Sequence, residues 1–150
     1  MLRGIRSEYQ NEKVLMGEAQ IGGFDLPVTA SIALAASTTT DGMDITIQLK
    51  DADGNAVSGV HVFDLWMSEA SSGAGLTGDT YSGDLTAGTG ALLGALTAKK
   101  AWRVQTNATG LFVATLVDSA NPADQYVAFS HPVTGQTVVS AVSGTNWEGA

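Results

Sequence analysis

The residues that could do chemistry are few and far apart. The chain of 150 residues has no cysteine and two histidines. His61 falls in an alternating, strand-like stretch, whereas His131 directly precedes Pro132 in a turn-like stretch. A base or nucleophile needs partners within hydrogen-bonding reach, so the two rings would act together only if the fold brought them side by side. The many serines form no Gly-x-Ser-x-Gly elbow. The sequence therefore predicts that the protein is not an enzyme.

Three oxygen-bearing residues, Asp51, Asp53 and Asn55, have a spacing that invites a calcium interpretation. A calcium loop of the EF-hand type has glycine at its sixth position and glutamate at its twelfth. Here Gly54 is fourth and Val62 is twelfth, so turn formation is the better interpretation. An incidental cation is the alternative. The absence of cysteine excludes thiolate metal sites, and no glycine-rich loop carries a phosphate-binding lysine. We expect no metal and no cofactor.

Charge and hydropathy narrow the classes of partner. The formal net charge is −8, which argues against nucleic acid because phosphate binding needs clustered Lys and Arg. Lys99, Lys100 and Arg103 form the only dense basic group after the first 13 residues. They are either solvated strand ends or a docking surface for an acidic partner. No apolar run of about 18 residues could span a membrane, and no signal-peptide core follows Met1. We expect no membrane partner and no export signal.

The elements that must position these residues are strands. Strand-like stretches lie at 28–36, 45–49, 60–67, 101–106, 112–117, 126–129 and 136–142, and the period-two alternation is clearest at 28–36 and 45–49. The pattern predicts an all-β fold, an immunoglobulin-like β-sandwich of about seven strands at residues 27–150. Both faces of 60–67 are largely apolar, so we expect a central strand covered on both sides. The glycine-rich segment 68–91 predicts a long loop with a weak edge strand near 81–86.

Residues 1–26 differ from the rest and predict an extended N-terminal arm. Short polar stretches, interrupted by Gly17, Gly22 and Gly23, carry apolar residues that so short a segment cannot bury by itself. Such an arm is either loosely ordered or lies against a neighbour. The residues that we expect to contact a partner are Leu2, Ile5, Tyr9, Val14, Leu15, Ile21 and Phe24.

Several motifs resemble known families. The turn at residues 51–60, Asp-Ala-Asp-Gly-Asn-Ala-Val-Ser-Gly-Val, and the hairpin at 105–116 resemble bacterial and phage Ig-like domains. Residues 62–70, 75–77 and 96–101 are similar to small virion proteins of tailed bacteriophages. The resemblance covers about residues 44–142 and leaves the arm unmatched.

This resemblance implies a capsid decoration, or cement, protein. Such a protein would be assembled in the host cytoplasm and would lie on the outer surface of the capsid, bound to the major capsid protein. By analogy it would also associate with itself as a trimer or dimer. The resemblance transfers no catalytic residue.

Two alternatives remain at this point. The first is another virion component, such as a head fibre, neck or tail protein. The second is an Ig-like module that binds carbohydrate or the host surface, with residues 68–91 as its recognition loop. Tyr81 is the only aromatic residue of that loop, which gives little support for stacking on a sugar.

Overall fold

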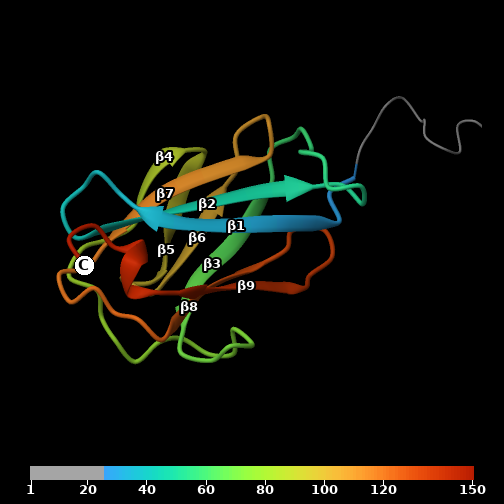
Figure 1. The fold of residues 1–150 in the computed structure, drawn as a ribbon. Coiled ribbons are helices and arrows are strands. Elements are labelled where there is room, and N and C mark those ends of the chain that lie inside the picture. The colour runs from blue at the N-terminus through green and yellow to red at the C-terminus, as the bar shows by residue number, and fades with distance from the viewer. Residues whose placement is uncertain (1–25) are drawn as a thin grey trace, which may run out of the picture.

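The computed structural model describes residues 26–150 and shows two antiparallel sheets packed face to face (Figure 1). The first sheet has the strand order β1-β2-β7-β4 and the second has the order β5-β6-β3-β8-β9. The strands are β1 (Thr29–Ala36), β2 (Gly42–Lys50), β3 (Val62–Ser68), β4 (Thr86–Thr89), β5 (Ala91–Thr97), β6 (Ala101–Gln105), β7 (Leu111–Val117), β8 (Gln125–Ser130) and β9 (Thr137–Val142). The predicted all-β fold is confirmed, and the architecture is that of a β-sandwich.

Alternation along the strands builds the core between the sheets. In β2, Met43, Ile45, Ile47 and Leu49 are fully buried, while the residues between them are half-buried on the outer face. Facing residues of the other strands complete one continuous apolar cluster. Burial of each large aliphatic side chain contributes about 1.5–3 kcal/mol, so this inner face explains why the strands keep their register.

Aromatic contacts join the two sheets. Phe63 of β3 meets Phe112 of β7 edge to face, with ring centroids 6.1 Å apart, and lies 4.9 Å from Phe129 of β8. At one end of the sandwich, Trp147 stacks on Tyr81 at 6.3 Å and donates its indole N–H to the carbonyl of Pro122. This contact follows a single 3-10 turn at Gly144–Asn146. Among residues 26–150, no helix is long and apolar enough to cross a bilayer.

The turn at residues 51–55 is a corner between the sheets. Oδ1 of Asp51 accepts hydrogen bonds from the backbone N–H groups of Asp53 and Asn55, both at 2.9 Å. Gly54 takes φ +86°, which a residue without a Cβ adopts readily. The backbone hydrogen bond from Asn55 is the main reason that the pKa of Asp51 lies below its usual value. The predicted turn chemistry is confirmed.

The number of strands was predicted too low, since residues 26–150 form nine strands rather than about seven. The additional strands are β4, which lies at Thr86–Thr89 instead of 81–86, and β5. The ladder between β5 and β6 shifts register at two places, after Leu92 and after Ala95. Each shift adds one residue to β5, Leu93 and Leu96 respectively, so the period-two pattern is lost there.

One further expectation was wrong in part, and another was confirmed. Strand β3 is central in its sheet, but its outer face is not covered, because Val62 is 45% exposed. Segment 68–91 has no strand or helix at residues 69–85, so the predicted loop is confirmed there, and Thr77, Tyr81 and Leu85 of this loop are buried. These residues seal one side of the core, which explains how a glycine-rich stretch is held without regular structure.

Candidate functional site

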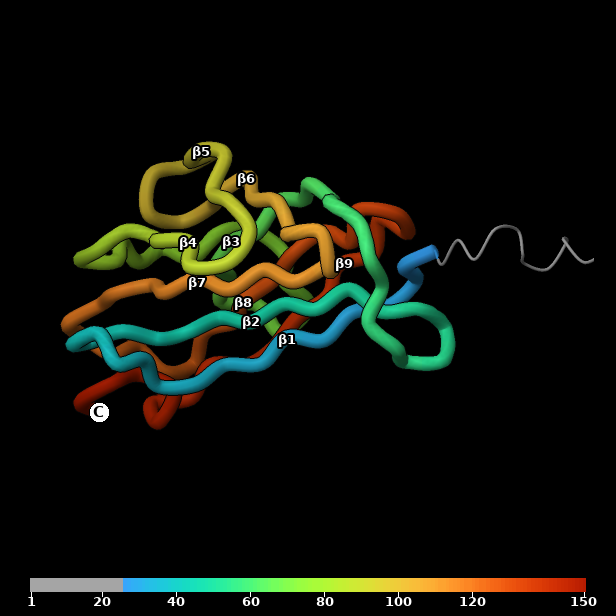
Figure 2. Tube along the Cα trace, turned by 90° about the horizontal axis from the view of Figure 1, so that it is seen from above, coloured from blue at the N-terminus to red at the C-terminus, as the bar shows by residue number. Residues whose placement is uncertain are grey.

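The predicted arm contacts lie outside the described residues. Leu2, Ile5, Tyr9, Val14, Leu15, Ile21 and Phe24 all precede residue 26. The described chain begins at Leu26, which is half exposed, and Val28 N–H donates to the carbonyl of Lys50 at 2.9 Å. Residue 26 therefore lies beside the corner that joins β2 to β3, at one end of the sandwich (Figure 2).

The two histidines have different surroundings. His131 is buried, and its Nδ1 accepts hydrogen bonds from the backbone N–H groups of Val133 and Thr134, both at 3.2 Å. Because Nδ1 accepts, Nε2 carries the proton and donates to the carbonyl of Thr29 at 3.1 Å. His131 thus fastens the β8–β9 turn to β1. The half-buried His61 is held through its backbone by Thr106. Within residues 26–150, neither ring is hydrogen-bonded to a carboxylate or a hydroxyl.

The acidic residues form no evident metal centre. Among residues 26–150, no group of three or more His, Asp or Glu side chains is placed to hold an ion. Asp51, the first candidate ligand, uses Oδ1 to accept two backbone N–H groups of its own turn. The Asp51 carboxylate therefore caps backbone N–H groups of its own turn.

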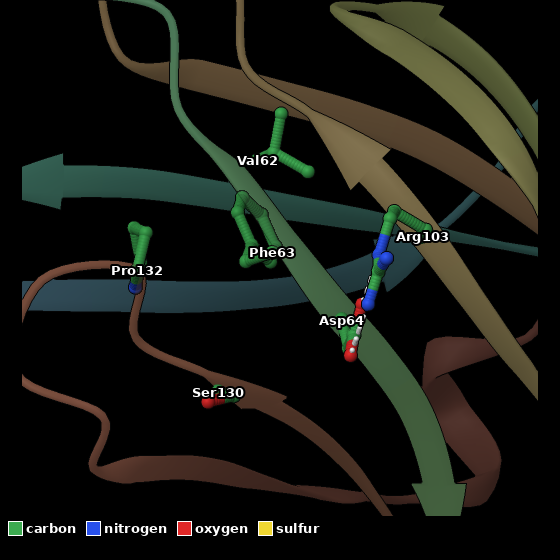
Figure 3. Close-up of a pocket in the computed structure, with 6 residues that line it drawn as sticks. All are labelled: Val62, Phe63, Asp64, Arg103, Ser130 and Pro132. Carbon is green, nitrogen blue, oxygen red and sulfur yellow. Dashed lines mark hydrogen bonds and ion pairs between the residues drawn. The ribbon is translucent and has the colours of Figure 1, made fainter.

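A shallow pocket of about 250 Å³ lies on the outer face of the five-stranded sheet (Figure 3). Its lining includes an ion pair in which Arg103 Nε and Nη2 donate to the two carboxylate oxygens of Asp64 at 2.8 and 3.1 Å. The hydrogen bonds to Asp64, followed by its charge, raise the pKa of Arg103. Both side chains are partly exposed, so water screens the pair. Ligand pockets usually have volumes of at least about 300 Å³, so this pocket is small for a metabolite.

The most distinctive surface lies on β5, at the edge of the same sheet. Leu92, Leu93 and Leu96 are 36%, 50% and 50% exposed, and we call them the leucine patch. No residue of β5 is charged, and the β5–β6 turn carries Lys99 and Lys100. Leu93 and Leu96 are the extra residues of the two bulges. Bulges at sheet edges change the direction in which side chains point.

A second pocket of about 200 Å³ lies beside β4 and β7. We call it the β4–β7 pocket, and its lining residues are small: Thr39, Thr86, Ala87, Gly88, Thr115 and Val117. Of these residues, Thr115 donates a hydrogen bond from Oγ1 to Oδ1 of Asp44 at 2.5 Å. The pocket is therefore small, and no charged side chain lines it.

Sequence reasoning missed both the leucine patch and the β4–β7 pocket. A signal for the patch was present, since three leucines within five residues surround a glycine in a run without charge. The pocket has no such signal, because its walls come from three segments far apart in the chain. No family model, curated protein or solved structure matches this chain. Inference about function consequently depends on the residues and contacts described above.

Proposed function

We propose that this protein is a decoration, or cement, protein of a tailed-bacteriophage capsid, which binds the major capsid protein on the outer surface and stabilises the shell without catalysis. The observation that carries the proposal is a well-packed β-sandwich with an uncharged, leucine-rich edge, preceded by a segment rich in apolar residues. The resemblance of residues 62–70, 75–77 and 96–101 to small virion proteins supports the choice of a phage virion as the place where this protein acts.

The mechanism is attachment through buried area. A stable protein interface buries roughly 1,600 Å² in total, which a β body and an apolar arm can supply together. Contacts repeated over a shell add through effective concentration, so modest single contacts give firm attachment. The arm residues named above would fill grooves between capsid subunits, while the sandwich stays rigid because its core side chains interlock.

The alternatives differ in how well the structure supports them. A head fibre, neck or tail protein would share the same resemblance, and partitioning between purified heads and tails separates these locations. A carbohydrate-binding role for segment 68–91 is disfavoured, because Tyr81 is buried and stacked on Trp147. Its ring is therefore not available to a sugar.

Binding to purified shells tests the proposal. Full-length protein is added to capsids that lack it, and bound copies are counted after sedimentation. We expect saturable binding, and we expect the triple variant Leu15→Ser, Ile21→Ser and Phe24→Ser to lose at least tenfold in affinity. A matched control changes only polar arm residues, Gln10→Ser and Gln20→Ser, and should bind like the wild type. Failure of the wild-type protein to bind any shell would refute the proposal.

A further inference from the structure

A second group of exposed apolar side chains surrounds the pocket on the outer face of the five-stranded sheet. Val60, Val62 and Val133 are 54%, 45% and 40% exposed, and we call them the valine rim. Val62 lines the pocket of about 250 Å³, and so does Pro132, the neighbour of Val133 (Figure 3). Each rim residue therefore lines the pocket or lies within two residues of one that does, so the rim and the pocket form one partly apolar surface.

Two hydrogen bonds of Thr29 place this surface beside the start of the described chain. The carbonyl of Thr29 accepts the Nε2–H group of His131 at 3.1 Å, two residues before Val133. Its Oγ1 donates to the carbonyl of Asp51 at 3.2 Å, at the corner between β2 and β3. Leu26 precedes Thr29 by three residues. The chain therefore enters the sandwich between the β8–β9 turn and this corner.

The residues directly before Leu26 supply an aromatic ring at this end of the sandwich. Phe24 is two residues away, and a chain spans at most about 3.6 Å per residue, so the ring stays close to the point of entry. A cavity of about 150 Å³ is enough to bind benzene, so the pocket has room for one phenyl ring. Covalent attachment gives Phe24 an effective concentration at this surface that no separate partner has.

Charge favours the valine rim over the corner as the place where Phe24 packs. Asp25 follows Phe24 directly, and the corner at residues 51–55 carries two further aspartates that would repel it. At the pocket, by contrast, Arg103 and Asp64 form an ion pair and balance each other. The rim therefore accepts the ring without bringing like charges together.

We infer that Phe24 packs on the valine rim of its own chain, with its ring at the mouth of the adjoining pocket. The contact anchors the root of the arm and fixes the direction in which the preceding residues leave the domain. This inference goes beyond the proposed function, because it holds whether or not the protein binds a shell. In a decoration protein, Phe24 contributes to attachment by orienting the arm, and the apolar residues before it keep their proposed contacts with the shell.

Limited digestion of the full-length protein with chymotrypsin tests this inference, because the protease cleaves after aromatic residues and the arm contains Tyr9 and Phe24. In the rim variant Val62→Ser, Val133→Ser, cleavage after Phe24 should become at least tenfold faster, while cleavage after Tyr9 keeps its rate. A matched control, Leu76→Ser, removes another exposed apolar side chain and should be cleaved like the wild type. Unchanged cleavage after Phe24 in the rim variant would overturn the inference.

The absence of cysteine allows a direct test of proximity. Gly23→Cys is combined either with Val133→Cys or with Asp53→Cys, and both of these sites lie two residues from a hydrogen-bonding partner of Thr29. A disulfide needs Cα atoms within about 7 Å. We expect the first pair to oxidise at least tenfold faster than the second, within single chains, and we expect Phe24→Ser to remove this advantage.

Two outcomes of the oxidation experiment would contradict the inference. Equal rates for the two pairs would show that the root of the arm does not prefer the rim. Disulfides that form only between chains, seen as dimers on a non-reducing gel, would show that the ring packs on another copy. Circular dichroism confirms that each variant is folded.

Discussion

Gly90 joins β4 to β5 and so carries the chain from one sheet to the other. Its φ of +80° favours glycine, and a Cβ there would lie 2.3 Å from the carbonyl oxygen of Gln105 and 3.1 Å from the ring of Phe112. Gly54 has a similar φ of +86°, but a Cβ at that position would meet no atom within 4 Å. The pair Gly90→Ala and Gly54→Ala therefore separates steric overlap from backbone strain.

The expected costs follow from these two geometries. Alanine in the left-handed region costs about 1–2 kcal/mol at either position. The reduced freedom of the unfolded chain favours alanine equally in both variants and cancels in the comparison. Overlap with the Gln105 carbonyl adds about 1–3 kcal/mol at Gly90, because a packed backbone must move. We expect Gly54→Ala to lose about 1–2 kcal/mol and Gly90→Ala about 2–5 kcal/mol of unfolding free energy.

Urea unfolding followed by tryptophan fluorescence measures both values, since Trp66, Trp102 and Trp147 all lie in the described domain. Equal m-values would show that only stability has changed. If the two variants lose the same free energy, the crossing at Gly90 is not tight, and the argument from the close approach to Gln105 fails.

Three other predictions concern single side chains. Leu65→Ala in the buried core should cost about 2–5 kcal/mol in urea unfolding, whereas Leu93→Ala on the surface should stay within about 0.5 kcal/mol, and equal losses would contradict the assigned core. Burial, followed by the charge of Asp79, raises the pKa of the Tyr81 hydroxyl above its usual value of 10.0. The protonated hydroxyl therefore stabilises the fold below pH 10, and this contribution is lost as pH rises beyond it. Tyr81→Phe should show a shallower loss of thermal stability above pH 10, and an unchanged slope would refute this. Asp64→Asn should leave the melting temperature unchanged at high salt, because water screens the exposed pair with Arg103; a large loss there would show that the pair is structural.

The sequence predicted most clearly the strands that bury one face. In β2, the alternation of Ile45, Ile47 and Leu49 with polar residues is the direct consequence of one inner and one outer face. Strand β5 lacks this property, because six of its seven residues are exposed and two of them are bulge residues. Its pattern therefore resembles a loop, although hydrogen bonds to β6 hold it as a strand.

The surroundings of β3 could not be predicted from residue types. The apolar residues of 60–67 predicted a covered outer face, but the indole N–H of Trp66 donates to the carbonyl of Gly73, so a nearby loop and not another layer satisfies it. The contact between Asp64 and Arg103 spans 39 residues of sequence, and it depends on the register between β3 and β6. Such pairings follow from topology, which alternation alone does not determine.

Counting this protein in purified virions is the most direct measurement of its proposed role. Quantitative mass spectrometry of tail-free heads gives its copy number relative to the major capsid protein. We predict a fixed ratio to the shell subunit that survives washing and falls when the apolar arm residues are replaced by serine. Absence of the protein from heads, or its recovery only with tails, would contradict a decoration role.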